Sequence, residues 1–428
     1  MRRRCPRCPV LTFALAALLC IIYLLTPKGL KLAIENSFLR GVLPQSSQSP
    51  TELRQLQLPA CLATWRDSRP IRHAPLLQSL QQFCRSSNKS KVAVGSRQRY
   101  SAFHQPHFAE YFFFYISVLI EMAHSSSDCR QIYFSVLEDI PEFWNDVLKG
   151  KQTWVTQFIE VMRRSLGDFL IADDDAYRLG IKIFDSGAEN LREKTGVWFL
   201  HPSDGAWLTS HVLSIDICSH FHTPLTPTRA VILQRENYRS ILNLPEIERE
   251  ILTASPIPGS VAVSTVFFDA MSFKEQAGAM LTADLLISVH GAGLTNIVFM
   301  KPCSVVIEIL PYGFVGPGKE QLLRLGGYFG ALAIGLDLIF LKYMESKVNS
   351  ILDKTARFPG NQKECSEIYP PISDDKEAAA ADCMKTIFCR SCVKQANLYI
   401  NRTTLRPLIK EGLRLRDQCR LTHPAFAG

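Results

Sequence analysis

The stretch DLLISVHGAGLTNIVFMKPCSVVIEIL, residues 284–310, decides the fold of this chain. An apolar strand over 285–289 leads into the turn His290-Gly-Ala-Gly, then a short helix and a second apolar strand over 305–310. Small residues between a strand and a helix expose backbone N–H groups and the positive helix end, which together hold phosphate oxygens. In open α/β sheets, ligands bind beyond the carboxyl ends of the strands. By themselves, the glycines are also consistent with a steep reversal of the chain.

The residues before this stretch alternate between strands and helices. Residues 230–234 and 261–268 are apolar and rich in β-branched or aromatic residues, as strands are. Asn243 and Ser272 each precede a Glu by three residues, a pattern that opens a helix. Apolar strands alternating with helices predict a parallel sheet covered on both faces. Residues 226–345 therefore read as a Rossmann-like nucleotide-binding domain.

Three segments resemble the signature of glycosyltransferase family 61. The first is HGAGLTN at 290–296, with VIEI following at 306–309. The others are ILQRENYRSILN at 232–243, similar to the family's Arg-x-Asn-x-Arg segment, and MSFKEQAGAMLTADLLIS at 271–288, similar to its Ser-Phe-x-Glu-Gln helix. The resemblance is clear over about residues 228–315 and faint elsewhere.

The resemblance implies a fold and an activity. It implies a GT-B-like α/β architecture, in which two Rossmann-like domains face a cleft. It also implies an inverting transferase that moves N-acetylglucosamine or a pentose from a uridine nucleotide sugar to a glycan or glycoprotein acceptor. No cofactor is required in this mechanism, because helix N–H groups and cations can neutralise the departing diphosphate.

The expected donor-binding residues lie in the loop after 230–234, in the glycine turn with its helix, and in the strand that follows. They are Arg235, Asn237, Arg239, His290, Gly291, Ala292, Gly293, Leu294, Thr295, Asn296 and Glu308. Arg235 would bind the phosphates bidentately beside the backbone donors of the turn. His290 and Arg235 are also the candidates for a catalytic role, and the catalytic base is not assigned.

Glu308 is the most informative carboxylate, because it interrupts a strand that is otherwise apolar on both faces. A buried charge needs a strong partner or a ligand. One interpretation is that it accepts the ribose hydroxyls of a uridine nucleotide. The other is a buried ion pair with Arg235 or Arg239.

Two alternative functions remain open at this stage. Asp173-Asp-Asp175 follows an apolar run and is typical of metal-dependent, GT-A-type transferases, in which Asp173 and Asp175 would hold Mn²⁺ or Mg²⁺. Many family 61 members carry a His in the segment that matches Tyr111–Phe114, where this chain has only Tyr and Phe. That difference favours a second alternative, a catalytically inactive lumenal glycan-binding relative.

Length and charge narrow the class of protein. A chain of 428 residues is too long for one core and indicates two domains. The formal net charge is +8, of which Arg2, Arg3, Arg4 and Arg7 supply half. The remainder is small, so no nucleic-acid partner is expected.

The amino terminus predicts a membrane anchor. Basic residues precede the apolar run Val10–Leu25, and no small-residue cleavage site follows it. The expected organisation is a cytoplasmic tail (1–9), a transmembrane signal anchor (10–26), a stem (27–58), an acceptor-side α/β domain (59–225), the nucleotide-sugar-binding domain (226–345) and a cysteine-rich extension (346–428). The protein would then be a single-pass type II protein of the Golgi or endoplasmic reticulum membrane, with its catalytic region in the lumen.

Cysteines and sequons agree with a lumenal compartment. Ten cysteines follow the anchor, an even set that favours disulfides, although Cys303 at a buried strand reads as a free thiol. Cys389 and Cys392 read as part of a structural disulfide region rather than a redox or zinc pair. Asn88 and Asn401 lie in glycosylation sequons.

The amino-terminal half reads as a second α/β layer. Its central feature is a buried helix over 108–122. The other expected elements are strands at 131–137, 169–172, 181–184 and 197–200, helices at 141–148 and 155–166, and a last helix over about 404–419 that packs back on this first domain.

Overall fold

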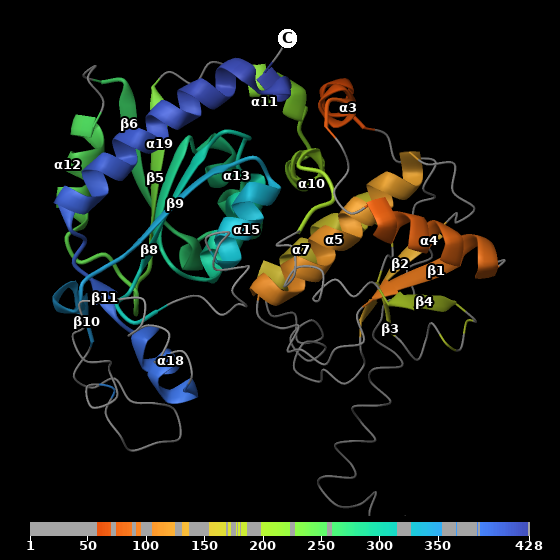
Figure 1. Cartoon of the computed structure of the whole chain (residues 1–428), viewed down its shortest axis with the longest axis horizontal. Coiled ribbons are helices and arrows are strands. Elements are labelled where there is room, and N and C mark those ends of the chain that lie inside the picture. Colours follow the sequence, from red (N-terminus) through yellow and green to blue (C-terminus); the bar gives the residue numbers. More distant parts are fainter. Residues whose placement is uncertain are drawn as a thin grey trace, which may run out of the picture.

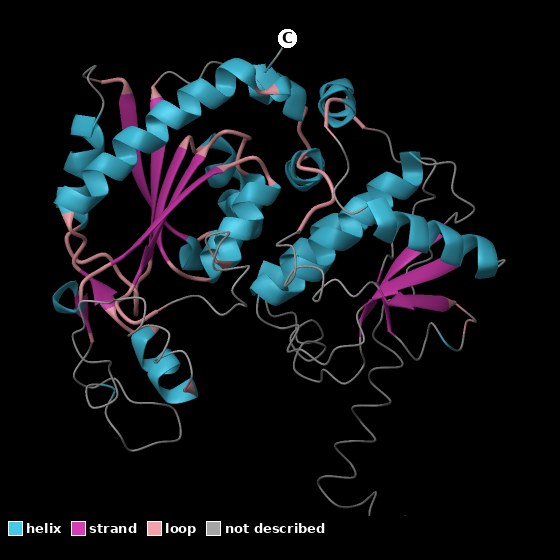
Figure 2. Cartoon of the chain, in the orientation of Figure 1, coloured by secondary structure: helices cyan, strands magenta, loops and turns pink. Residues whose placement is uncertain are grey.

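The computed structural model describes residues 58–69, 74–87, 91–95, 105–124, 131–136, 154–167, 170–172, 177, 179, 181–185, 198–222, 227–254, 259–314, 327–352, 365, 383 and 386–426. Figures 1 and 2 show two large groups of strands and one short pair, with helices packed around and between the large groups. Each large group forms a wholly parallel sheet. The α/β class predicted from the sequence is confirmed.

The larger sheet holds the residues of the glycine turn. Its five strands are β5 (Thr228–Gln234), β6 (Val261–Phe267), β7 (Leu285–Val289), β8 (Val305–Leu310) and β9 (Ile339–Met344). Their spatial order is β6-β5-β7-β8-β9, so the winding direction reverses between β5 and β7. Ligands of open parallel sheets bind at such a reversal, outside the carboxyl ends of the strands.

Helices connect these strands, and the sequence predicts the three that follow Asn243, Ser272 and the glycine turn. The connecting helices are α12 (Leu244–Ala254), η2 (Phe268–Ala270), α13 (Phe273–Thr282), η3 (Ala292–Phe299) and α15 (Tyr328–Gly335). Ser272 and Glu275 form the expected capping box at the start of α13. The helix after the glycine turn is a 3₁₀ helix, which is tighter than an α-helix.

The smaller sheet has the order β3-β2-β1-β4. Its strands are β1 (Lys91–Gly95), β2 (Gln131–Val136), β3 (Leu170–Ala172) and β4 (Lys182–Asp185). The helices beside it are α4 (Ala74–Ser87), α5 (Gln105–His124) and α7 (Trp154–Leu166). The buried helix expected over 108–122 is confirmed as α5, which contacts β2 on one side and η3 on the other.

The two sheets share one apolar core. A single cluster of buried residues runs from Val92 of β1 through α5, α7 and α10 (Ser203–Leu213) to Leu286 and Val306 of the larger sheet. The opposite face of that sheet has its own core, which is covered by α12 and α19 (Arg402–Thr422). Side chains from both parts of the chain therefore meet beside the glycine turn.

The last helix packs on a different part of the protein than the sequence suggests. α19 crosses the larger sheet and contacts β8, β9 and α12, rather than the first domain (Figure 1). The turn that follows, η5 (Pro424–Phe426), reaches α3 (Ala60–Asp67) and α11 (Ile217–His222). Gly412 allows this close approach, because a Cβ there would lie 2.6 Å from Val305 Cγ1.

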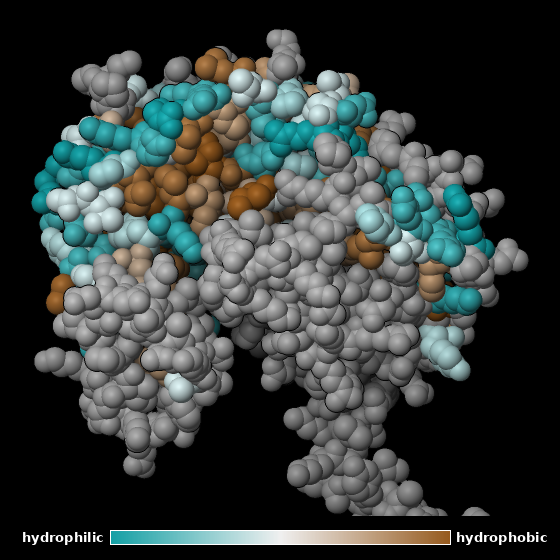
Figure 3. All heavy atoms as spheres, viewed as in Figure 1, coloured by the Kyte–Doolittle hydropathy of each residue, from teal (hydrophilic) through white to brown (hydrophobic). Residues whose placement is uncertain are grey.

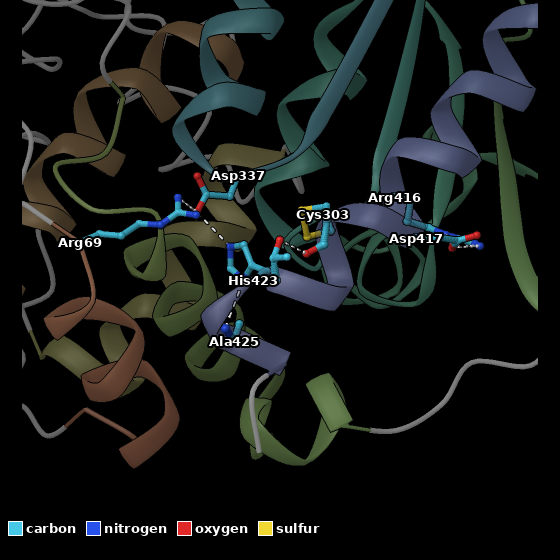
Figure 4. The surroundings of a disulfide bond; sticks show 9 residues. Arg69, Cys303, Asp337, Arg416, Asp417, His423 and Ala425 are labelled. Atoms are coloured by element: carbon cyan, nitrogen blue, oxygen red, sulfur yellow. Dashed lines mark hydrogen bonds and ion pairs between the residues drawn. A yellow bond between two sulfur atoms is a disulfide. The ribbon is translucent and has the colours of Figure 1, made fainter.

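Two further expectations are wrong. Trp198–Leu200 is buried but irregular instead of forming a strand, because the Leu200 N–H donates to Ser117 Oγ on α5 and not to a neighbouring strand. Cys303 is not a free thiol: it forms a disulfide with Cys419 at the end of α19 (Figure 4). The long separation of these two cysteines in sequence hides the pairing.

The other disulfides support an oxidising compartment. Between described cysteines they are Cys61–Cys218, Cys365–Cys392 and Cys383–Cys389. Cys389 and Cys392 thus pair with other cysteines instead of each other, as expected for a structural disulfide region. α18 (Ile387–Val393) carries both. The short strands β10 (Ser350–Ile351) and β11 (Asn397–Leu398) pair with each other, and Leu398 also bridges to Ile241 in the loop after β5.

Figure 3 shows one face of the molecule coloured by hydropathy. Apolar side chains gather below α19, where the half-buried strand β9 forms the edge of the larger sheet. The outer side of α19 is mostly hydrophilic in the same view. No described helix is both long and apolar enough to cross a membrane. The expected tail and anchor, residues 1–26, lie outside the described residues, as do residues 27–57 of the expected stem and the helix expected at 141–148.

Candidate functional site

The loop after β5 brings two arginines to the glycine turn. Gln234 holds the loop closed, because its side-chain amide donates to Ile241 O and its carbonyl oxygen accepts from Ile241 N, both at 2.9 Å. Ser240 Oγ donates to Arg235 O across the loop. Arg239 adopts the left-handed conformation, with φ of 57°, at the bend of the loop.

The glycine turn lies against these guanidinium groups. A Cβ on Gly291 would lie 2.8 Å from Arg235 Nη1 and 3.4 Å from Arg239 Nη1, so a larger residue would displace the cations. A Cβ on Gly293 would lie 2.8 Å from Leu233 Cδ2. Gly291 therefore permits a close approach of the backbone to the guanidinium groups, and Gly293 permits one to the apolar side chains of Leu233 and Phe268. The Leu294 N–H donates to Gly291 O, which uses one of the four backbone donors expected at this turn.

The two arginines form a concentrated positive charge. Both guanidinium groups lie over the Tyr238 ring, at 5.0 and 5.2 Å from its centre. Arg239 Nη1 donates to His290 O at 2.9 Å, and no carboxylate of the described residues forms an ion pair with either arginine. Burial, together with the charge of Arg235, lowers the pKa of Arg239 to about 10. An anion bound here would relieve this repulsion.

Glu308 pairs with His290, which neither interpretation of its sequence anticipates. His290 Nδ1 lies 2.5 Å from Glu308 Oε1, and the Glu308 side chain is 3% exposed. The His290 ring also packs near Phe314 and Phe329, with ring centres 4.4 and 5.3 Å apart. A carboxylate accepts the Nδ1–H, which fixes the orientation of the ring at the entrance to the turn.

A cavity of about 290 Å³ lies beside the turn. It opens at the carboxyl ends of β5, β6 and β7, at the reversal of strand order. α7 supplies its remaining wall through Trp154 and Gln157. The other lining residues are Leu233, Gln234, Arg235, Phe268, Asp269, Met271, Gln276, Ser288, Val289, Gly291, Ala292 and Gly293. The cavity thus joins a phosphate-binding type of turn and a cation to a surface that mixes polar side chains with the aromatic rings of Trp154 and Phe268.

The remaining expected residues lie beneath or away from this surface. Thr295 and Asn296 are fully buried, and Asn296 hydrogen-bonds Trp154, Gln276 and Gly293. Asn237 is exposed on the arginine loop. The structure therefore brings Arg235, Arg239 and the turn together, while Asn296 hydrogen-bonds the turn from below and Thr295 is buried in the helix that follows it.

The expected glycosylation and metal-binding residues do not line this cavity in the described part of the chain. Asn401 is exposed and caps α19, with its Oδ1 accepting from Thr403 N, whereas Asn88, Asp173 and Asp175 lie outside the described residues. The described residues contain no group of three His, Cys, Asp or Glu side chains that could hold a metal ion. Trp154 and Gln157 escape sequence reasoning, because α7 shows only the pattern of an amphipathic helix.

Comparison with known proteins identifies the segment that forms this site. A family model described as Glycosyltransferase 61 matches residues 208–307. These residues carry the signature of glycosyltransferase family 61. The match covers β5, β6, β7 and the glycine turn, so the family 61 signature and the cavity coincide.

Curated relatives agree with the family 61 match. A beta-1,2-xylosyltransferase, XAX1 of Oryza sativa subsp. japonica, is 26% identical over 194 residues, 43% of this chain and 28% of that enzyme. The EGF domain-specific O-linked N-acetylglucosamine transferase of Gallus gallus is 35% identical over 82 residues, 19% and 15%. The protein O-linked-mannose beta-1,4-N-acetylglucosaminyltransferase 2 of Tetraodon nigroviridis is 27% identical over 163 residues, 38% and 26%. In these three cases the chain spans less than a third of the relative's length.

Proposed function

We propose that this protein is an inverting, GT-B-like glycosyltransferase that uses a uridine nucleotide sugar as its donor. The observation that carries the proposal is the pair of guanidinium groups, Arg235 and Arg239, held against the Gly291–Gly293 turn without a described carboxylate partner. Cations and backbone N–H groups aimed at one point suit the diphosphate of such a donor. The match to family 61 and the names of the relatives support the same class of reaction.

In this proposal the diphosphate lies over the turn, where Arg235 and the N–H groups of residues 291–293 neutralise its charge. The acceptor hydroxyl attacks the anomeric carbon, the new bond forms from the opposite side, and the bond to the β-phosphate breaks with inversion. Charge then grows on the departing diphosphate, and the same donors stabilise it. The hydroxyl proton passes to a base that we do not assign. No cofactor is needed for this step.

The cavity is the best place for the nucleoside. It adjoins the turn and offers Phe268 as aromatic surface beside polar groups such as Asp269. In place of the ribose contact expected from the sequence, we propose that Glu308 orients His290, since the two side chains hydrogen-bond each other. His290 Nε2 is then the ring nitrogen available to the donor phosphate or sugar.

The acceptor class follows from the relatives. They are named for transferring xylose, arabinose or N-acetylglucosamine, and two of the names specify an EGF domain and O-linked mannose. We therefore propose a glycan or glycoprotein acceptor and a sugar that is either N-acetylglucosamine or a pentose. Four disulfides between described cysteines support a lumenal catalytic region. We propose that it lies in the Golgi or endoplasmic reticulum behind a type II anchor and a stem (27–58). It would then comprise an acceptor-side domain (59–225), a donor domain (226–345) and a cysteine-rich extension (346–428).

Two experiments test this function. The purified full-length chain should bind uridine diphosphate in a calorimeter and slowly hydrolyse one of several uridine nucleotide sugars when no acceptor is present. Failure to bind uridine diphosphate would remove the donor assignment, and binding without any turnover would favour the inactive glycan-binding relative. For the compartment, glycosidase treatment should increase the mobility of the expressed chain in a gel. A chain that carries no glycan and has reduced cysteines would contradict the lumenal assignment.

A further inference from the structure

Trp154 belongs to α7, a helix from the amino-terminal half, yet it reaches the segment of the family signature. Its Nε1–H donates to Asn296 Oδ1 at 2.9 Å. The indole ring stacks on Phe158 and meets Phe273 edge-on, with ring centres 5.0 and 5.2 Å apart. The side chain is 9% exposed, so its position is set by packing on both sides.

Asn296 connects Trp154 to two turns, one directly and the other through Gln276. Its amide nitrogen donates to Gly293 O in the glycine turn and to Gln276 Oε1, each at 3.2 Å. Gln276 Nε2 donates in turn to Phe268 O and Met271 O, each at 3.0 Å, in the turn after β6. One chain of hydrogen bonds therefore runs from α7 to both turns that border the cavity.

We call Trp154, Asn296 and Gln276 the relay, because their side chains are linked to one another by hydrogen bonds. Both Asn296 and Gln276 use their side-chain oxygen and their amide nitrogen within it. Asn296 is fully buried and Gln276 is 9% exposed, so water can replace few of these bonds. Loss of one member leaves a buried polar atom without a partner, which costs more than the bond itself.

A second hydrogen bond attaches α7 to the segment that borders the cavity. Gln157 Oε1 accepts the backbone N–H of Phe273, at the first turn of α13, at 2.8 Å. α7 is thus attached at the start of the helix that carries Gln276, as well as at the glycine turn. The wall of the cavity made by α7 is therefore hydrogen-bonded to the rest of the cavity at two points.

We propose that Trp154 is a positioning residue for the donor site, through which the amino-terminal half of the chain holds the two turns at the spacing that a nucleoside diphosphate requires. The proposal rests on the proposed function, because it assigns the cavity to the donor. Trp154 acts through Asn296 and not by contacting the reacting atoms.

The variant Trp154→Phe tests the relay. It removes the indole N–H but keeps an aromatic ring against Phe158 and Phe273. We expect the affinity for uridine diphosphate, measured by calorimetry on the full-length chain, to fall about tenfold. Trp207→Phe is the matched control: Trp207 on α10 is also fully buried, and its Nε1 has no partner among the described residues. It should stay within about twofold of the wild type, since it loses the same atoms without breaking a hydrogen bond.

Amide hydrogen exchange provides a readout that does not need the donor. In the ligand-free protein, Trp154→Phe should accelerate exchange in residues 268–271 and 291–296, whereas Trp207→Phe should not. If Trp154→Phe fails to fold, Gln276→Met breaks the same relay at its far end with little change in volume. Unchanged exchange and unchanged affinity in a folded relay variant would overturn the proposal.

Different results would contradict the proposed donor function and the positioning role of Trp154. A wild-type chain that binds neither uridine diphosphate nor pyrophosphate contradicts the proposed function and takes the donor role of Trp154 with it. A wild-type chain that binds uridine diphosphate, together with a Trp154→Phe variant that binds it equally well, leaves the function intact and contradicts the positioning role. Faster exchange in both tryptophan variants would show general loosening instead of a relay, and would also contradict it.

Discussion

His423 Nε2 lies 3.1 Å from Asp337 Oδ2, which ties the end of the last helix to the turn after α15 (Figure 4). Arg69, just after α3, binds the same carboxylate oxygen, and Ala425 N donates to His423 Nδ1. Three distant parts of the chain thus converge on one carboxylate. Since Nδ1 accepts a hydrogen bond, Nε2 must carry the proton that is shared with Asp337.

Asp337→Asn should lower stability by about 1–3 kcal/mol, because it removes the charge that His423 and Arg69 share. Asparagine tolerates the left-handed backbone at this position, where φ is 56°, so the loss reports on charge. Asp417→Asn is the control, since Asp417 also pairs with an arginine but its side chain is 65% exposed. Urea unfolding should show a change of less than about 0.5 kcal/mol for the control.

The contribution of Asp337 should also depend on pH. Burial by itself raises the pKa of this carboxyl, but the hydrogen bond from His423 and the charge of Arg69 outweigh burial and leave the pKa below its ordinary value. The unfolded chain therefore binds the proton first as the pH falls. The stability difference between wild type and Asp337→Asn should be complete above about pH 4 and shrink below it, as the pH falls toward the lowered value. A difference that grows in acid would contradict this assignment.

The Cys303–Cys419 disulfide should stabilise the fold more than Cys383–Cys389. The two bonds close loops of very different length, with sequence separations of 116 and 6. By loop entropy, serine at both cysteines of a pair should cost roughly 5 kcal/mol for the long loop and roughly 2 kcal/mol for the short one. Thermal or urea unfolding of the two double variants measures the difference. Equal losses would mean that loop entropy does not set the contribution of these bonds.

Arg235→Ala should weaken the binding of uridine diphosphate by about 2 kcal/mol, because a charge-assisted contact to the diphosphate is lost. Arg249→Ala, on the exposed side of α12, is the control and should leave the affinity unchanged. Calorimetry on the full-length chain measures both values. Equal affinities for wild type and Arg235→Ala would move the diphosphate away from the turn.

Glu308→Gln keeps the volume of the side chain but removes the charge that holds His290. We expect the fold to persist and the affinity for uridine diphosphate to fall by about 1 kcal/mol as His290 loses its orientation. Glu345→Gln is the control, because Glu345 is equally buried but binds Asn401 N and Asn349 instead of the turn. An effect of the same size in both variants would show that the loss comes from buried charge in general.

Chelation separates the proposed mechanism from the metal-dependent alternative. If the turn and Arg235 neutralise the diphosphate, hydrolysis of the donor should survive a chelator, and Asp173→Asn with Asp175→Asn should change it less than about twofold. In the alternative, the chelator abolishes hydrolysis and Mn²⁺ restores it. A folded, inactive double variant would assign the chemistry to the acidic triplet.

Local sequence patterns predict four of the five strands of the larger sheet closely and miss β9. The runs 285–289 and 305–310 are apolar on both faces and bounded by turn residues, so the predicted strands match β7 and β8. Ser272 and Glu275 are correct as a cap because a capping box depends only on residues three positions apart. β1 is missed, since KVAVG is too short to show a pattern outside the sheet that it joins.

In the candidate site, too, local patterns predict some features and long-range packing decides the others. The sequence by itself determined the glycine turn, the two arginines and the family signature, because each of these features lies within a short run of the chain whose spacing carries the chemistry. Only the tertiary structure decided that Glu308 faces His290, that Cys303 pairs with Cys419, and that Trp154 supports the turn. Those partners are 18, 116 and 142 residues apart. Contacts over such separations depend on how sheets and helices pack, which no local pattern records.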